Sequence, residues 1–270
     1  MSINGLGYFS LVAMGVVFIL HFYNILFPPG CRDARGRRGL AMCHEILGMI
    51  SKALARLLSK AQSYPRPLII FILGAPGVGK GTASVYLKAA FPRLTHLSYG
   101  DLARYQDSIP GSWVSSFPRR EGTSNPLLPA GDGVKLILDT IWGGVERGQM
   151  VWVIDGFPRT EEHVTEWAAR MPPAACTLYL SCPPEISVSR ILGRAGTSGR
   201  LDDADLEKVK SRVERAHADS KPMLSTLERS GMRIIRVDAA RDVEIVKEEV
   251  LRHVLLAKQE WESDRLDLSL

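Results

Sequence analysis

The sequence has 270 residues, a formal net charge of +5 and 46% hydrophobic residues, which suits one large domain with an appendage or two small domains. The charge is uneven, because the residues before Leu68 carry eight Lys and Arg against two acids, whereas the rest carries 26 basic and 27 acidic residues. The balanced main part argues against nucleic acid as its partner, for which a basic face would be expected. The basic N-terminal cluster is typical of the solvated flank of a membrane segment.

Residues 1–30 form a hydrophobic segment. The first 27 residues contain no Lys, Arg, Asp or Glu, and residues 6–27 are long enough to cross a bilayer as a helix. An arginine cluster at 32–38 follows directly, and the positive-inside rule would keep the C-terminal side in the cytosol. We therefore expect a membrane anchor with the main domain facing the cytosol. The alternative is an organelle-targeting segment, such as one for the mitochondrion, that is either retained or cleaved.

Residues 31–67 are expected to be a basic linker with an amphipathic helix. Between residues 40 and 62 apolar side chains recur at helical spacing, so this helix could lie on a membrane surface or pack on the domain. Residues 64–67, Tyr-Pro-Arg-Pro, form a stiff break. We place the start of the main domain, residues 68–270, after this break.

From Leu68 onward, short apolar runs alternate with longer segments of helical periodicity. The expected strands are 68–73, 95–98, 151–155, 177–180 and 233–238. The expected helices lie near 79–90, 132–147, 160–170, 184–194, 203–230 and 242–260. This alternation predicts an α/β domain with a parallel five-stranded sheet covered on both faces. Residues 108–129 are rich in Gly, Pro and Ser and are expected to be loop-rich, with short helices at most.

The first expected strand runs into a glycine-rich phosphate loop. Residues 74–80, Gly-Ala-Pro-Gly-Val-Gly-Lys, match G-x-x-x-x-G-K between a strand and a helix. The N–H groups at the start of that helix would cradle phosphates, and Lys80 would reach the β- and γ-phosphates of a nucleotide. The residues expected to bind the phosphates of ATP in this loop are Gly77, Val78, Gly79, Lys80, Gly81 and Thr82.

The loop ends in Gly81 and Thr82, which completes the pattern G-x-P-G-x-G-K-G-T. In this pattern the chain resembles the nucleoside monophosphate kinases, the family of adenylate kinase and UMP-CMP kinase. Two further motifs stand where that family has them, HLSYGDLAR at 96–104 and DGFPR at 155–159. The resemblance covers residue 68 to about 256. It implies a three-layer P-loop fold with an acceptor-binding insertion at about 98–130 and a short lid at about 194–204.

The resemblance also assigns the acceptor side. Arg104 and Arg159 would bind the phosphate of the acceptor nucleotide, a task that suits the two-pronged guanidinium group. Asp155 would orient the water shell of Mg²⁺, with Thr82 nearby, and Mg²⁺ arriving with ATP is the cofactor that the family uses. The complete set implied for the acceptor is Ser98, Tyr99, Arg104, Gly156, Arg159, His163, Arg200 and Arg212.

A third block, RAGTSGRLDD at 194–203, resembles the short lid of the family. Its glycines would let the lid close and expel water. Arg194 and Arg200, with Arg212 on the next helix, would neutralise the transferring phosphoryl group, and Arg194 would also contact the phosphates of ATP. The expected catalytic residues are these three arginines together with Lys80 and Arg159. No zinc is expected, because the lid is too short for the zinc-binding insertion of longer-lid relatives and the four cysteines lack zinc-ligand spacing.

The implied reaction is reversible phosphoryl transfer from ATP·Mg²⁺ to a nucleoside monophosphate. The acceptor phosphate is largely ionised near neutral pH, since its second pKa is about 6, so no proton-abstracting side chain is needed. The resemblance implies ATP and the monophosphate as small-molecule partners, and we expect a monomeric kinase domain.

The identity of the acceptor base is the least determined part of this interpretation. AMP is the expected acceptor, and UMP or CMP is the alternative. The positions where the family usually reads the base hold Tyr99 and His163, and a histidine lacks the paired hydrogen-bonding groups of an amide. A membrane-tethered nucleotide-binding protein with weak or no kinase activity is the alternative from another functional class.

Overall fold

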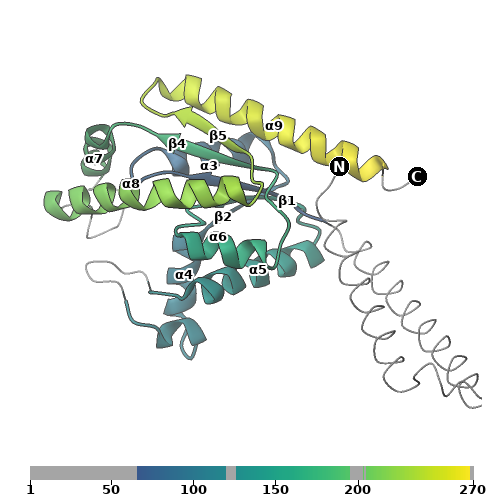
Figure 1. Ribbon diagram of the computed structural model, residues 1–270, viewed down its shortest axis with the longest axis horizontal. Helices are drawn as coiled ribbons and strands as arrows, with labels where there is room; N and C mark the ends of the chain where they lie inside the picture. Colours follow the sequence, from purple (N-terminus) through teal and green to yellow (C-terminus); the bar gives the residue numbers. More distant parts are fainter. Residues whose placement is uncertain (1–65, 120–125, 195–202, 204, 268–270) are drawn as a thin grey trace, which may run out of the picture. The chain divides into compact units, whose positions relative to one another are not determined.

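Five parallel strands form the centre of the structure (Figure 1). The computed structural model describes residues 66–119, 126–194, 203 and 205–267, which fall within one compact unit. The strands follow the spatial order β2-β3-β1-β4-β5. Their bounds are β1 Leu68–Leu73, β2 Leu94–Ser98, β3 Val151–Asp155, β4 Cys176–Ser181 and β5 Ile234–Asp238. The predicted α/β class and its parallel five-stranded sheet are confirmed.

Strand β1 occupies the middle of the sheet because all six of its side chains are apolar and buried. It pairs in parallel with β3 and with β4, so that Ile70 lies between Val153 and Cys176. A parallel strand covered on both faces requires such an unbroken apolar run. Alternate side chains of β1 therefore contribute to two separate hydrophobic cores, one on each face of the sheet.

Helices cover both faces (Figure 1). Helices α3 (Lys80–Ala90) and α9 (Val243–Asp267) pack on one core. Helices α5 (Ala130–Glu146) and α6 (Glu161–Ala168) pack on the other core, together with the C-terminal part of α8 (Leu206–Arg229). Helix α7 (Pro184–Gly193) packs on the N-terminal part of α8 through Ile191, Val209 and Val213.

Local sequence fixes where several helices begin. The Thr160 hydroxyl accepts the backbone N–H of His163 and caps α6, and the Asp205 carboxylate caps α8 in the same way. Ser98 caps α4 (Tyr99–Ser108), a helix that the sequence analysis did not predict. The other α-helices follow the expected ranges, with differences mainly at their ends.

The stretch between α4 and α5 is irregular, in agreement with its composition. Its described residues, 109–119 and 126–129, include the short 3₁₀ helix η1 (Trp113–Ser116) and an antiparallel bridge between Arg119 and Pro126. An ion pair of 3.0 Å between Arg119 and Asp107 ties this stretch back to α4.

The expected membrane anchor at 1–30 lies outside the described residues, as does nearly all of the linker at 31–67. Within the part of the chain that the structure describes, no helix combines the length and apolar character needed to cross a membrane. The anchor and the linker helix therefore stay predictions.

Because all five strands run in the same direction, their carboxyl ends share one edge of the sheet. In open α/β sheets, ligands bind in the crevice outside this edge. The glycine-rich loop follows β1, Ser98 ends β2 and Asp155 ends β3, so the predicted site segments meet there.

Candidate active site

A cleft of about 850 Å³ opens at the carboxyl edge of the sheet. The glycine-rich loop, the start of α4, the turn after β3 and the side chains of α8 contribute to its walls. The predicted site residues that line it are Gly77, Val78, Gly79, Lys80, Gly81, Thr82, Ser98, Tyr99, Arg104, Asp155, Gly156, Arg159, His163, Arg194 and Arg212. The structure thus gathers onto one cleft residues that are up to 135 positions apart in the sequence. Arg200 lies outside the described residues, so its assignment stays a prediction.

The glycine-rich loop is shaped by glycines that no other residue could replace without strain. Gly74 and Gly77 have positive φ angles of 140° and 82°. A methyl group added at Gly77 would lie only 2.3 Å from the carbonyl oxygen of Ser187, and one at Gly74 would lie 2.2 Å from that of Leu180. The backbone of the loop thus lies against β4 and α7 with no room for a side chain at these two positions. The loop can therefore approach a phosphate with backbone alone.

The start of α3 is suited to binding an anion. Its N-cap is Gly79, which has a positive φ of 106° and provides no side-chain cap. Lys80 begins the helix, and its Nζ donates to the carbonyl oxygens of Gly74 at 2.9 Å and Ala75 at 3.0 Å. The ammonium group is thus held across the loop, next to the helix N-terminus, where N–H groups and the helix dipole favour negative charge.

The two predicted acceptor-phosphate arginines converge above Gly100. A methyl group added at Gly100 would lie 3.0 Å from the Nη2 of Arg159 and 3.4 Å from the Nη1 of Arg104. Arg104 forms an ion pair with Asp101 one turn away on α4. Arg159 donates from Nε to the carbonyl oxygen of Gly156 at 3.0 Å. Two guanidinium groups side by side provide the donors that a dianionic phosphate requires.

A second pair of arginines meets at a buried carboxylate. Asp203 is fully buried, and its Oδ1 accepts a hydrogen bond of 2.6 Å from the Nη2 of Arg212. Its Oδ2 lies 3.5 Å from the Nε of Arg194. The carboxylate therefore holds one arginine from the end of α7 and one from α8 on the same side of the cleft. The rest of the expected lid, residues 195–202 and 204, lies outside the described residues.

Asp155 offers an oxygen that fits a hydrated metal ion. Its Oδ1 is buried and has no hydrogen-bond partner among the described residues, and its Oδ2 lies 3.8 Å from the Nε2 of His96. Thr82 lines the same cleft with a hydroxyl group. Carboxylate and hydroxyl oxygens, completed by water and phosphate oxygens, are the ligands that Mg²⁺ prefers. Within the described ranges, no three His, Cys, Asp or Glu side chains gather as a protein-only metal site would require.

The predicted base-reading residues form a buried aromatic cluster. Tyr99 is 4% exposed and His163 is 6% exposed, and both pack edge-on against Phe157, with ring centroids 5.4 and 5.1 Å away. The Nδ1 of His163 lies 3.1 Å from the Thr160 hydroxyl, and its Nε2 is buried without a hydrogen-bond partner in the described part of the chain. Burial, aided by the Arg159 charge, lowers the pKa of His163 to about 4, so the ring is neutral at pH 7.

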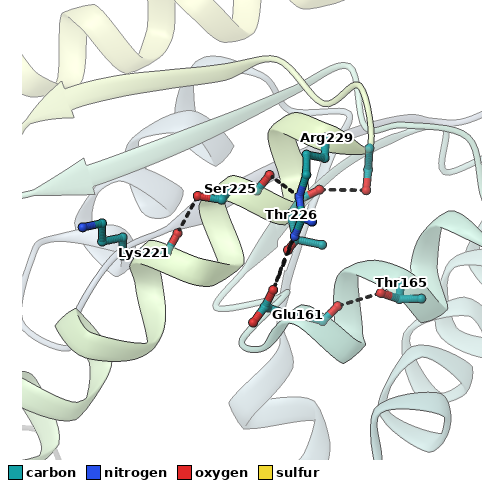
Figure 2. A network of polar contacts seen from close by, with 7 residues as sticks. Glu161, Thr165, Lys221, Ser225, Thr226 and Arg229 are labelled. Carbon is teal, nitrogen blue, oxygen red and sulfur yellow. Dashed lines mark hydrogen bonds and ion pairs between the residues drawn. The ribbon is translucent and has the colours of Figure 1, made fainter.

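A polar network fastens α6, the helix that carries His163, to α8 (Figure 2). The hydroxyl of Thr226 donates to the Oε2 of Glu161 at 2.7 Å, and the Nη2 of Arg229 donates to the same hydroxyl at 2.6 Å. Glu161 is the first residue of α6, directly after the capping Thr160. The network therefore connects α6, whose His163 lines the cleft, to the helix that carries Arg212.

The structure adds cleft residues that the sequence analysis missed. Arg190 on α7 lines the cleft and donates to the carbonyl oxygen of Ala239, just after β5. Arg241, Val243 and Lys247, between β5 and the first turns of α9, line the same end. Their position in the sequence could have identified them, because they follow the last expected strand and loops after parallel strands lie at the carboxyl edge of the sheet, where ligands bind.

Comparisons with known proteins agree with this arrangement. Residues 72–232 match the family model described as adenylate kinase. The uridylate kinase of Schizosaccharomyces pombe is 31% identical over 184 residues, which span 68% of this chain and 95% of the relative. The UMP-CMP kinase of Gallus gallus is 31% identical over 194 residues (69% and 96%), and that of Homo sapiens is 29% identical over 194 residues (69% and 96%). The matches extend over nearly the whole length of these relatives.

Proposed function

The chain belongs to the nucleoside monophosphate kinase family, and from this membership we propose that it transfers the γ-phosphoryl group of ATP to a pyrimidine nucleoside monophosphate, UMP or CMP. The chain is thus an enzyme, a phosphotransferase whose acceptor is itself a phosphate group. The observation that carries the assignment of phosphoryl transfer is that one cleft is lined by five cationic side chains, Lys80, Arg104, Arg159, Arg194 and Arg212.

The choice of a pyrimidine acceptor rests on the relatives. Proteins similar over nearly their whole length are named UMP-CMP kinase or uridylate kinase. These names favour UMP or CMP over AMP, which was the first expectation from the sequence. The alternative of a membrane-tethered nucleotide-binding protein without kinase activity gains no support, because these relatives are named as kinases.

We assign the two ends of the cleft to the two nucleotides. The loop at 74–82 binds the β- and γ-phosphates of ATP, with Lys80 as the cation that contacts them. Arg104 and Arg159 bind the acceptor phosphate above Gly100. Two polyanions repel each other strongly, so the work of the site is to offset that repulsion and align the attacking oxygen with the γ-phosphorus.

The attacking group needs no base. A monophosphate oxygen carries its negative charge at neutral pH, and the side chains therefore act only by position and charge. Arg194 and Arg212, held together by Asp203, stabilise the charge that spreads over the transferring phosphoryl group. When bound, Mg²⁺ supplies charge neutralisation across the phosphates of ATP. Asp155 would hold it through water, with Thr82 close by.

The test is an acceptor panel with the full chain. Initial rates of ADP formation are measured with ATP·Mg²⁺ and UMP, CMP, AMP or GMP in turn, and compared as kcat/KM. We expect UMP or CMP to exceed AMP by at least about tenfold, the effect of losing one net hydrogen bond to the base. A preference for AMP would overturn the pyrimidine assignment, and turnover with none of the four would overturn the kinase.

A further inference from the structure

Tyr99 stands in direct contact with one of the two acceptor-phosphate arginines. The Arg159 guanidinium carbon lies 4.7 Å from the centroid of the Tyr99 ring, over its face. This distance is well inside the range of a cation–π interaction, which strengthens when the partners are shielded from water. Tyr99 is 4% exposed, so its ring is shielded.

The Tyr99 ring is itself fixed from three sides. Phe157 and His163 pack edge-on against it, with centroid distances of 5.4 and 5.8 Å. On the α5 side, a methyl group added at Gly133 would lie 2.5 Å from the Tyr99 hydroxyl oxygen. The phenol thus occupies a space that exists because α5 has a glycine there. Burial raises the pKa of Tyr99, so the ring remains a neutral phenol at working pH.

We propose that Tyr99 is a positioning residue that holds Arg159 ready for the acceptor phosphate. The guanidinium group is restrained by the Tyr99 ring and by the Gly156 carbonyl, which accepts from Nε at 3.0 Å. Its Nη2 lies beside Gly100, 3.0 Å from the position that a Cβ atom would take there, and the Nη1 of Arg104 lies 3.4 Å from the same position. A guanidinium stacked on a ring face is fixed in orientation, and a pre-ordered arginine loses less rotamer freedom when it binds a phosphate.

This inference rests on the proposed function, because it assigns Arg159 to the acceptor. Its first test compares Tyr99→Leu, which removes the ring, with Tyr99→Phe, which keeps the ring and removes the hydroxyl. Tyr105→Leu is the matched control, since Tyr105 lies on the same helix, is 64% exposed and lies outside the cleft. Each full-length variant is assayed for kcat, for KM of the preferred monophosphate and of ATP, and for thermal unfolding.

We expect Tyr99→Leu to raise the acceptor KM by roughly 3- to 30-fold while the ATP KM stays within about twofold, the range set by a cation–π contact. Tyr105→Leu should leave both constants within about twofold, and Tyr99→Phe, which keeps the ring over Arg159, should raise the acceptor KM less than Tyr99→Leu does. A lowered melting temperature with an unchanged acceptor KM would overturn the proposal, as would a Tyr99→Phe variant as impaired as Tyr99→Leu. If wild type phosphorylates no monophosphate and calorimetry detects no UMP or CMP binding, the proposed function fails together with this inference.

A second test uses the space at Gly133. Gly133→Ala should displace the Tyr99 hydroxyl and thereby disturb Arg159 from a distance. In a Tyr99→Phe background the nearest ring carbon is 3.3 Å from the added methyl group, so the ring should be displaced less. The contact of the methyl group with His163 Nε2, at 3.0 Å, is the same in both backgrounds. Gly133→Ala should therefore raise the acceptor KM more in wild type than in Tyr99→Phe. Equal effects in the two backgrounds would overturn the proposed route through Tyr99.

Discussion

Asp203 is fully buried and accepts a hydrogen bond of 2.6 Å from Arg212, so an arginine that lines the cleft is anchored by a carboxylate that solvent does not reach. Its second oxygen lies 3.5 Å from Arg194. A buried charge that is paired in this way is costly to expose, and removing one partner typically destabilises a fold by about 3–5 kcal/mol. The same contact therefore serves the stability of the fold and the geometry of the cleft.

Arg212→Met tests this double role. We expect the free energy of unfolding to fall by about 2–4 kcal/mol, less than the full range because Arg194 remains beside the carboxylate. We expect kcat to fall by roughly 10²-fold or more, because a donor aimed at developing charge is lost. Urea denaturation and steady-state kinetics measure the two effects. Lys210→Met, a substitution at an exposed residue of the same helix, is the control and should change the free energy of unfolding and kcat little. An Arg212→Met protein with wild-type stability and kcat would contradict the assignment.

Gly77 in the phosphate loop can be compared with Gly148, a glycine outside the loop that has the same φ angle. Gly77 and Gly148 both have a φ of 82°, but a methyl group at Gly77 would meet the Ser187 carbonyl at 2.3 Å, whereas one at Gly148 would meet nothing within 4 Å. Gly148→Ala should therefore cost only the strain of the left-handed backbone, about 1–2 kcal/mol. Gly77→Ala should cost several kcal/mol more, because it adds a backbone collision. Chemical denaturation gives the free energy of unfolding of both variants. Equal losses of that free energy would contradict the prediction and would mean that the loop can move away from Ser187.

His163 makes stability depend on pH. Its pKa in the folded chain is about 4, below the ordinary 6.5, because burial and Arg159 disfavour the charged ring. As the pH falls below 6.5, His163 becomes protonated in the unfolded chain but stays neutral in the folded chain. The free energy of unfolding therefore decreases by roughly 3 kcal/mol by pH 4. Denaturation curves at several pH values should show this slope in wild type and a shallower one in His163→Phe. Parallel slopes would contradict a buried neutral histidine.

The sheet could be predicted closely because each strand is encoded in its own local stretch of sequence. The six apolar residues of β1 require a strand covered on both faces, and the glycine-rich turn after it requires a helix start. Helix α4 was missed because its ten residues, YGDLARYQDS, are mostly polar and hold a glycine in the first turn. The available signal was the cap, since the hydroxyl of Ser98 accepts the N–H of Asp101.

The sequence predicts those site residues that stand in recognisable motifs, but it does not predict how their side chains are arranged. Arg104 and Arg159 stand in recognisable motifs, but their convergence above Gly100 depends on how the ends of β2 and β3 come together. The fit between Tyr99 and Gly133 joins two positions that no local pattern connects. Such complementarity arises from packing between helices, and single-chain periodicity carries no information about it.

The central claim is that this cleft brings the phosphates of two nucleotides together so that the γ-phosphoryl group passes from one to the other, and ³¹P nuclear magnetic resonance of the reaction mixture tests it most directly. The full chain is incubated with ATP·Mg²⁺ and UMP or CMP, beside an otherwise identical Lys80→Met protein. The account predicts that resonances of ADP and of the pyrimidine nucleoside diphosphate grow at equal rates with the wild-type protein and at most at a small fraction of that rate with Lys80→Met. Release of inorganic phosphate and ADP without any pyrimidine nucleoside diphosphate would contradict it, as would equal rates for the two proteins.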